Sequence, residues 1–341
     1  MVVFVPWTAP GDKIVAQVTE NKKRFLEAEL VEILSPSKHR REPACPVFGR
    51  CGGCTWQHVE YQEQINQKDL ILKSALKKWN GNFNWREFLP SPDEYRYRNR
   101  IQVNKNGSSV GFFGRGSRDI VDISDCPITE QALAEKIPSL HDRADGRYEI
   151  SRRLDGSVEI ESGRRSPEAA LFSQVNTKQN DIMIANLMSW ARELSFDHVW
   201  DLYCGSGNLT LPLWEHFPDA GVTGVELSAE SIRQAQKKSS DIEWFAQDVA
   251  KFLKSQKPLE KLLVVLDPPR VGADDEVVKQ LGRLKPEFVL YVSCNPMTFF
   301  RDASRLRNFG FELDRVQGFD MFPQTEHVEL MSLFRPALST R

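Results

Sequence analysis

The second half of the chain alternates short apolar segments with helical patterns, and this alternation narrows the possible folds more than any other feature. Apolar runs at 198–204, 221–227, 261–269 and 287–294 are each followed by a segment with helical periodicity. Buried strands separated by single helices are typical of a doubly wound, mostly parallel sheet with helices on both faces. We therefore predict an α/β domain over residues 172–341.

The first half is predicted to be mainly β structure. Alternating segments at 13–20 and 24–34 predict a small N-terminal β unit. Apolar residues at helical spacing predict a helix at about 59–79. Alternation returns at 95–165 with Gly-, Asp- and Asn-containing turns, which predicts a central antiparallel β domain. The predicted domains are residues 1–40, 41–171 (including the helix) and 172–341.

Composition excludes several classes of protein. The chain has 341 residues with 20 Phe and 8 Trp, more aromatic surface than a disordered chain uses. It has neither a signal-peptide pattern nor an apolar run of the roughly 20 residues that span a bilayer. We therefore expect a cytoplasmic protein without a membrane partner.

Charge is distributed unevenly along the chain. The net charge is −2, yet residues 38–118 contain 15 Lys and Arg against 7 Asp and Glu. A basic segment joined to a mildly acidic one is typical of a protein that binds nucleic acid with one part and has its activity in another part. An uneven solvated surface explains the same distribution equally well.

A glycine-rich turn follows the first predicted strand of the α/β half. Residues 201–208 read DLYCGSGN and open a helix, whose free N–H groups bind polar ligand atoms. Glu226 ends the next strand, where a carboxylate accepts hydrogen bonds from ribose hydroxyls. Thr210 stands where a dinucleotide fingerprint has its third glycine. The pattern favours an adenosine ligand without a pyrophosphate, such as S-adenosylmethionine.

Further chemistry-bearing residues follow later strands of the same predicted sheet. Asp267 begins DPPR, and Cys294 lies in SCNP. Since the carboxyl ends of parallel strands form the ligand crevice, both are candidates for a site there. The structural alternatives are a turn former for Asp267 and a buried small hydrophobe for Cys294. His327 and Glu329 are two residues apart on the last predicted strand, so we expect them to share one face.

Four cysteines suggest a metal site. Cys45, Cys51 and Cys54 lie within ten residues, and Cys126 stands apart. Four soft sulfur ligands suit either tetrahedral zinc or an iron–sulfur cluster, and the spacing alone does not choose between them. The alternative is four buried free cysteines.

Together, these motifs resemble those of the RNA 5-methyluridine methyltransferase family, which methylates C5 of uridine in ribosomal or transfer RNA. The resemblance covers nearly the whole chain and implies a class I, Rossmann-like methyltransferase domain. Arg270 stands where amino-group methyltransferases usually have an aromatic residue, which weighs against that chemistry. The motifs are FSQVN (172–176), DLYCGSGN (201–208), VEL (225–227), DPPR (267–270), SCNP (293–296) and HVEL (327–330).

The resemblance implies roles for individual residues. Cys294 would be the nucleophile that adds to C6 of uracil and makes C5 reactive toward the methyl group. Glu329 would be the base that removes the C5 proton afterwards. The implied contacts to S-adenosylmethionine are Gln174, Tyr203, Asn208, Glu226, Asp248 and Asp267.

The first half also takes part in the resemblance. The family's cysteine pattern implies a [4Fe-4S] cluster held by Cys45, Cys51, Cys54 and Cys126. Residues 6–12 resemble the opening of the small RNA-binding barrel called the TRAM domain, which implies a shortened, barrel-like N-terminal unit. Residues 95–100, YRYRNR, alternate like a strand, so Arg96, Arg98 and Arg100 could line one face that grips RNA phosphates. A half-exposed strand with solvated arginines explains the pattern equally well.

The predicted function is S-adenosylmethionine-dependent methylation of C5 of a uridine in RNA. Ribosomal RNA is the favoured partner, transfer RNA is the second choice, and a monomer is expected. An RNA cytosine-C5 methyltransferase is one alternative, because it also adds a cysteine to C6. A catalytically silent RNA-binding or redox iron–sulfur protein is the other.

Overall fold

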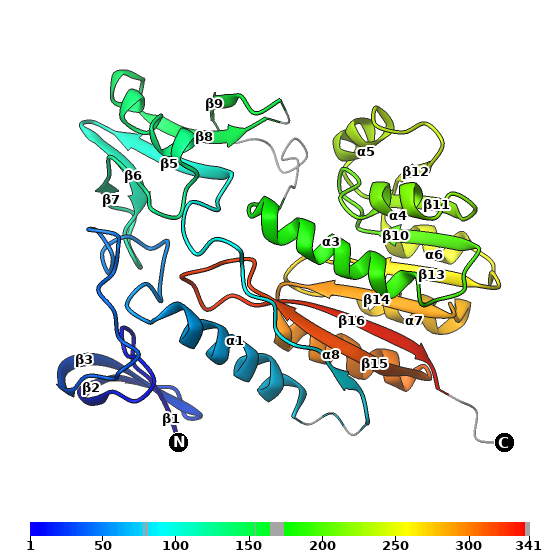
Figure 1. Cartoon of the computed structure of the whole chain (residues 1–341), viewed down its shortest axis with the longest axis horizontal. Helices are drawn as coiled ribbons and strands as arrows, with labels where there is room; N and C mark the ends of the chain where they lie inside the picture. The colour runs from blue at the N-terminus through cyan, green and yellow to red at the C-terminus, as the bar shows by residue number, and fades with distance from the viewer. Residues whose placement is uncertain (78, 80, 154, 164–173, 338–341) are drawn as a thin grey trace. The chain divides into compact units, whose positions relative to one another are not determined.

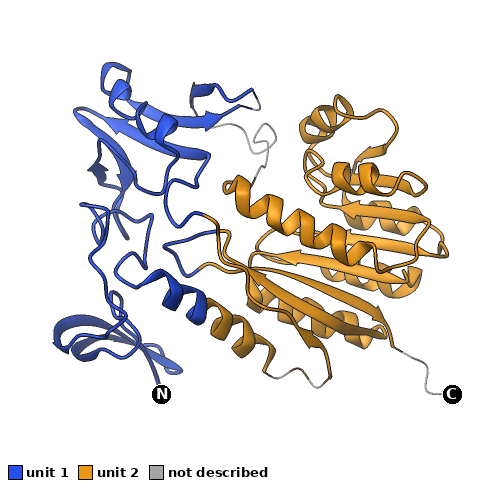
Figure 2. Cartoon of the chain, in the orientation of Figure 1, with its two compact units in different colours: residues 1–67, 93–164, 322–326 blue, residues 68–92, 165–321, 327–341 orange. Residues whose placement is uncertain are grey.

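The computed structural model describes residues 1–77, 79, 81–153, 155–163 and 174–337. The chain forms two compact units, which are coloured separately in Figure 2. Unit 1 comprises residues 1–67, 93–164 and 322–326, and unit 2 comprises residues 68–92, 165–321 and 327–341.

These units cut across the predicted three-domain division, which stays a prediction. Residues 68–92 were expected in the central domain and belong to unit 2. Residues 322–326 were expected in the C-terminal domain and belong to unit 1. The predicted boundary at 171/172 lies outside the described residues.

Unit 2 is built on an eight-stranded sheet with the order β12-β11-β10-β13-β14-β16-β15-β4 (Figure 1). The first five strands are parallel, whereas β16 runs antiparallel to both of its neighbours. This arrangement confirms the predicted doubly wound, mostly parallel sheet. The strands are β4 (Asn84–Trp85), β10 (His198–Leu202), β11 (Gly221–Glu226), β12 (Glu243–Ala246), β13 (Leu262–Leu266), β14 (Phe288–Ser293), β15 (Phe311–Phe319) and β16 (Glu329–Pro336).

Helices cover both faces of this sheet. In Figure 1, α3 crosses in front of the strands, whereas α7 and α8 lie behind them. All five residues of β13 are buried, as expected of a central strand covered on both faces. Of the helices in the described part of the chain, none combines the length and apolar character needed to cross a bilayer. The helices are α3 (Thr177–Ala191), α4 (Thr210–His216), α5 (Ala229–Gln236), α6 (Val249–Ser255), α7 (Asp275–Leu284) and α8 (Pro296–Asn308).

Side-chain caps determine where several of these helices begin. Ser228, Asp248, Asp274 and Asn295 each accept a hydrogen bond from a backbone N–H in the first turn of α5, α6, α7 and α8. A cap of this kind contributes about 1 kcal/mol. Since each cap follows a strand, the turn from strand to helix is fixed close to the carboxyl edge of the sheet.

Unit 1 contains two smaller sheets. A five-stranded antiparallel sheet, β7-β6-β5-β8-β9, confirms the predicted central β domain, and β1-β3-β2 form the N-terminal sheet. The apolar core of the larger sheet packs against Cys45, Cys51 and Cys126. The strands are β1 (Val2–Phe4), β2 (Lys13–Asn21), β3 (Phe25–Ser35), β5 (Arg100–Asn106), β6 (Ser109–Phe113), β7 (Ile120–Asp122), β8 (Gly146–Arg152) and β9 (Val158–Ser162), with the short helices α2 (Gln131–Ala134) and η1 (Pro138–Asp142).

The predicted arginine face at residues 95–100 is wrong. β5 begins only at Arg100, and Arg96 has a left-handed backbone with φ of 54°. The Arg96 guanidinium donates to both carboxylate oxygens of Asp125 at 2.7 Å and to the Cys126 carbonyl at 3.1 Å. Arg96 therefore anchors the loop that carries Cys126, because a bidentate ion pair holds it in place.

The predicted helix at 59–79 is α1 (Tyr61–Leu76), which carries a buried ion pair. The Lys68 ammonium lies 2.6 Å from the Asp320 carboxylate, and both side chains are 0% exposed. Removing one partner of a buried ion pair is strongly destabilising, because the other charge stays out of water.

We expect Lys68→Met to lower the free energy of unfolding by about 3–5 kcal/mol, because it removes the cation of a buried ion pair while the Asp320 carboxylate stays out of water. The double variant Lys68→Met/Asp320→Leu should be less destabilised than Lys68→Met, since no buried charge remains. Lys73→Met is the matched control, because its partly exposed pair with Asp69 on the same helix and its contact with the Trp85 ring, 5.3 Å away, together contribute only about 1 kcal/mol. Urea unfolding followed by circular dichroism measures all three, and similar losses for Lys68→Met and Lys73→Met would contradict this account.

Candidate active site

The carboxyl ends of the parallel strands form one edge of the unit 2 sheet, and the predicted site residues follow them. The strand order reverses at β10, which lies between β11 and β13. Ligands of open α/β sheets bind outside the carboxyl ends at such a reversal. Tyr203, Glu226, Asp267 and Cys294 lie at the ends of β10, β11, β13 and β14, respectively.

The glycine-rich turn and Glu226 are joined by hydrogen bonds. The Gly205 N–H donates to one Glu226 carboxylate oxygen at 3.2 Å, and the Ser228 N–H donates to the other at 2.8 Å. Tyr203 adopts a left-handed conformation with φ of 66°, and its N–H donates to the Val225 carbonyl at 2.9 Å. The two predicted contacts, Tyr203 and Glu226, are therefore brought together where β10 and β11 end.

Asn208 and Gln174 lie near the beginnings of helices. The side-chain amides of Asn208 and Asn180 exchange two hydrogen bonds of 3.0 Å, which ties the turn to α3. Gln174 is buried two residues before Asn176, the N-cap of α3. Residues 172–173 of the FSQVN motif lie outside the described residues.

Asp248 is the N-cap of α6. Its carboxylate caps α6 by accepting the Lys251 N–H at 2.9 Å. Burial raises the pKa of Tyr203 to about 12, and the nearby Asp248 charge adds to this rise. Asp248 therefore lies within electrostatic reach of Tyr203, beside the other predicted contacts.

Asp201 is a buried carboxyl to which the sequence analysis assigned no role. It is 1% exposed, and its Oδ2 accepts the Thr210 hydroxyl at 2.5 Å, whereas its Oδ1 has no partner among the described residues. Burial, reinforced by the charges of Asp267 and Glu226, raises the pKa of Asp201 to about 7. An orphaned buried oxygen in an acidic cluster fits a ligand that donates hydrogen bonds or carries positive charge. In the sequence, only the position of Asp201 at the start of the 201–208 motif indicated a role in ligand binding.

Cys294 faces Glu329 across two antiparallel strands. Ser293 of β14 pairs with Leu330 of β16, so the next position sets Cys294 opposite Glu329. Cys294 is half-buried, and Glu329 is 2% exposed. Residues that lie opposite each other at the end of such a pair are within reach of a shared substrate.

Burial raises the pKa of both groups. Burial, and then the charge of Glu329, raises the pKa of Cys294 to about 11, while Arg270 opposes this rise. Burial raises the pKa of Glu329 well above its usual range, and Asp267 adds to that rise. Burial also raises the pKa of Asp267 to about 7.

Positive charge on the exposed side favours the Cys294 thiolate. Arg270 is exposed, and its carbonyl accepts hydrogen bonds from the side chains of Asn295 and Thr298, both at 3.2 Å. Asn295 caps α8 directly after Cys294, so the positive end of the helix dipole lies beside the thiol. His327 precedes β16 and lies 3.4 Å from the Arg270 guanidinium, so the prediction that it shares a strand face with Glu329 is wrong.

The four predicted metal ligands all lie in unit 1. Cys45, Cys51, Cys54 and Cys126 are free and half-buried. Burial and the neighbouring cysteines raise the pKa of Cys51 and Cys126, and raise that of Cys54 to about 12. The sulfur atoms are thus within electrostatic reach of one another, and the Gly53 N–H points at the Cys51 sulfur at 3.4 Å. Within the described ranges, no group of three or more His, Cys, Asp or Glu residues forms a metal site.

Comparison with known proteins identifies the family. Residues 164–335 match the family described as tRNA (Uracil-5-)-methyltransferase. A Bdellovibrio bacteriovorus protein named "Uncharacterized RNA methyltransferase Bd3828" is 39% identical, over 98% of this chain and 90% of its own length. The chain belongs to the tRNA (uracil-5-)-methyltransferase family.

Other proteins that resemble this chain have names that specify the RNA and the position methylated. The Shewanella amazonensis protein named "23S rRNA (uracil(1939)-C(5))-methyltransferase RlmD" is 30% identical over 98% of this chain and 90% of its own length. The crystal structure of Pyrococcus abyssi tRNA (uracil-54, C5)-methyltransferase, solved with S-adenosyl-L-homocysteine, superposes with a TM-score of 0.78. That structure is 23% identical and covers 98% of this chain and 95% of its own, which confirms the class I methyltransferase fold.

We expect alkylation of Cys294 by iodoacetamide to accelerate about tenfold per pH unit until the pH approaches 11, because only the thiolate reacts. Glu329→Gln should accelerate the reaction at pH 9, since losing a negative charge lowers the pKa of Cys294. Arg270→Met should slow it by the opposite effect. Mass spectrometry of the Cys294 peptide gives the rates, and a plateau below pH 9 in the wild-type protein would contradict the raised pKa.

Proposed function

We propose that this methyltransferase transfers a methyl group from S-adenosylmethionine to C5 of a uridine in ribosomal RNA, with transfer RNA as the second candidate. The observation that carries the proposal is the placement of Cys294, directly after β14, beside Glu329, which begins the neighbouring strand β16. The preference for ribosomal RNA is supported by the named 23S rRNA relatives, which align with nearly the whole chain.

Cys294 would begin the reaction. C5 of uracil is a poor nucleophile, so a bond from the Cys294 sulfur to C6 is needed to move electron density onto C5. C5 then takes the methyl group from the sulfonium donor. Because the pKa of Cys294 is about 11 before RNA binds, the thiol must first lose its proton to solvent. Arg270 and the N-terminus of α8 favour the thiolate that remains.

Glu329 would complete the reaction. After methyl transfer, its carboxylate takes the C5 proton, the C5–C6 double bond re-forms and the Cys294 sulfur leaves. Burial raises the pKa of Glu329, so its carboxylate, once formed, is a stronger base than an exposed glutamate. A uridine stacked within structured RNA has to be flipped outward to reach these groups.

The methyl donor would lie along the strand ends. We propose that Gln174, Tyr203, Asn208, Glu226, Asp248 and Asp267 bind it, together with Asp201. S-adenosylmethionine carries a sulfonium and an ammonium group, and the cluster of Asp201, Glu226 and Asp267 supplies opposite charge. The unpaired Oδ1 of Asp201 supports a ligand with hydrogen-bond donors at this point.

We further propose that Cys45, Cys51, Cys54 and Cys126 hold a [4Fe-4S] cluster. The soft four-sulfur donor set, the mutual proximity of the thiols and the Gly53 N–H directed at sulfur support this assignment. Since the proposed methyl transfer moves no electrons, the cluster would have a structural or RNA-contacting role. We also propose a TRAM-like N-terminal unit over residues 1–40 and a cytoplasmic monomer.

Incubation with S-adenosylmethionine and 5-fluorouridine-substituted ribosomal RNA should trap a covalent protein–RNA adduct, because fluorine cannot leave C5 as a proton. The adduct should be visible on a denaturing gel and absent with Cys294→Ala. Transfer RNA transcripts substituted in the same way and tested in parallel show which RNA class is the substrate. The absence of an adduct with every transcript would contradict uridine-C5 chemistry.

Glu329→Gln should slow turnover by at least about a hundredfold, because the general base is lost while the methyl transfer step remains. The variant should accumulate a covalent adduct with unmodified RNA, which the wild-type enzyme releases. Glu312→Gln, at an exposed position of β15, is the control. Free turnover by Glu329→Gln without an adduct would assign the base elsewhere.

Cys51→Ser should lower the iron content and the visible absorbance of the purified protein, because it removes one of four proposed ligands. Cys204→Ser is the matched control, since this buried cysteine lies in unit 2 and is not a proposed ligand. Iron analysis after anaerobic purification measures both variants, and equal iron in Cys51→Ser and wild type would refute its ligand role.

A further inference from the structure

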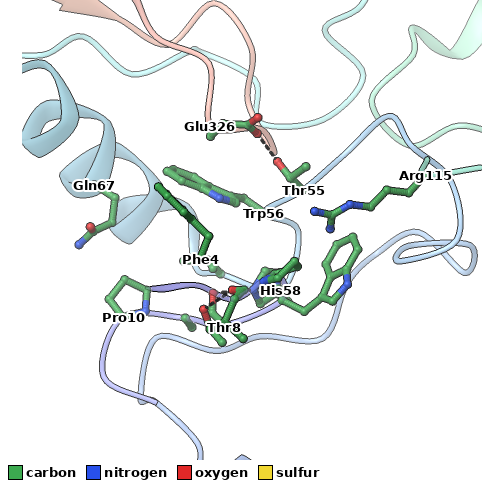
Figure 3. Close-up of a pocket in the computed structure, with 14 residues that line it drawn as sticks. Phe4, Thr8, Pro10, Thr55, Trp56, His58, Gln67, Arg115 and Glu326 are labelled. Carbon is green, nitrogen blue, oxygen red and sulfur yellow. Dashed lines mark hydrogen bonds between the residues drawn. The ribbon is translucent and has the colours of Figure 1, made fainter. Parts of the chain in front are cut away.

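A cavity lies entirely within unit 1, and Tyr203, Glu226, Asp267 and Cys294 do not line it (Figure 3). Its volume is about 610 Å³, within the range of pockets that bind small organic groups. Its walls come from the N-terminal segment 4–10, the segment 55–59 and the hairpin that carries Arg115. In Figure 3, Phe4 and Trp56 lie beside the cavity, and Arg115 extends toward it from the other side.

Aromatic rings and a guanidinium form much of the lining. The Arg115 guanidinium carbon lies 4.7 Å from the centroid of the Trp7 ring, and Trp7 packs edge-on against Phe48 with centroids 5.0 Å apart. Phe4 is 57% exposed, so its ring is open to a ligand. Flat rings and a stacked guanidinium are the surfaces on which nucleobases stack in single-stranded RNA complexes.

Backbone hydrogen bonds fix the segments that line the cavity. Trp7 adopts a left-handed conformation with φ of 66°, which is strained for a bulky residue. Its carbonyl accepts a 2.7 Å hydrogen bond from Arg40, and the neighbouring Thr8 carbonyl lies 3.1 Å from a ring nitrogen of His58. The backbone N–H of Arg115 donates to the Arg50 carbonyl at 3.1 Å. This bond ties the hairpin to the loop of residues 45–54, here called the cysteine loop. Such strain is typical of ligand clamps.

The charges favour a base inside the cavity and phosphates around it. Arg50, Arg115 and Arg118 are exposed on the cysteine loop and the hairpin, where they can contact a phosphate backbone. Glu326 lines the cavity and accepts the Thr55 hydroxyl at 2.5 Å. A carboxylate repels a phosphate, but it accepts hydrogen bonds from base N–H groups.

We propose that this cavity binds one unpaired nucleobase of the RNA substrate, away from the nucleotide that is methylated. The base stacks on the aromatic lining beside Arg115, and Glu326 accepts a hydrogen bond from it. This inference rests on the proposed function only in taking RNA as the substrate class.

The test measures RNA binding by the full chain rather than methylation. The probes are a fluorescein-labelled oligouridine dodecamer and a mixed-sequence RNA duplex of the same length, read by fluorescence anisotropy. Phe4→Ala and Arg115→Ala should each weaken single-strand binding about fivefold or more, with less than about a twofold effect on the duplex. Arg118→Ala, which removes the same charge from the same hairpin outside the cavity, should weaken both probes equally and by less.

The outcomes separate this proposal from the proposed function. Equal losses for Arg115→Ala and Arg118→Ala, equal losses on single strand and duplex, or no saturable single-strand binding by the wild type would each overturn the base pocket. All three variants should still form the covalent 5-fluorouridine adduct at saturating RNA. If the wild type forms no adduct but Phe4→Ala and Arg115→Ala lose single-strand binding selectively, the methylation proposal fails and the pocket stands.

Discussion

The antiparallel pairing of β16 with β14 brings together two groups that are 35 residues apart in sequence, Cys294 and Glu329. If β16 ran parallel to its neighbours, its first residue would lie at the opposite edge of the sheet, far from the thiol. The register matters as much as the direction, because a shift by one residue would turn Glu329 to the other face. The single reversed strand therefore underlies the chemistry proposed for the site.

The same packing that positions these groups removes them from water. Burial disfavours the charged forms of Cys294, Glu329 and Asp267 and so raises the pKa of each. Arg270 and the α8 N-terminus act in the opposite direction on the thiol alone. In a poorly solvated site such charges act more strongly than in water, so a cationic methyl donor would be attracted to the carboxyl cluster.

Much of the α/β half was predictable because its signals are local. Apolar runs, helical periodicity and the caps at Ser228, Asp274 and Asn295 lie within short stretches of chain. The prediction failed at 95–99, where an alternating pattern suggested a strand. There the ion pair of Arg96 with Asp125, 29 residues away, holds the backbone in another conformation. Asp201 was assigned no role because its unpaired oxygen is apparent only from burial.

The sequence by itself determined the order of strands and helices, the glycine turn at 201–208 and the cysteine spacing, since each depends on neighbouring residues. Only the tertiary structure decided that Cys294 faces Glu329, that Arg96 holds the Cys126 loop and that Trp7 and Arg115 line a cavity. Only it showed that burial raises the pKa of both Cys294 and Glu329. The physical reason is that strand pairing and loss of solvent join segments far apart in the chain, and no local pattern encodes them.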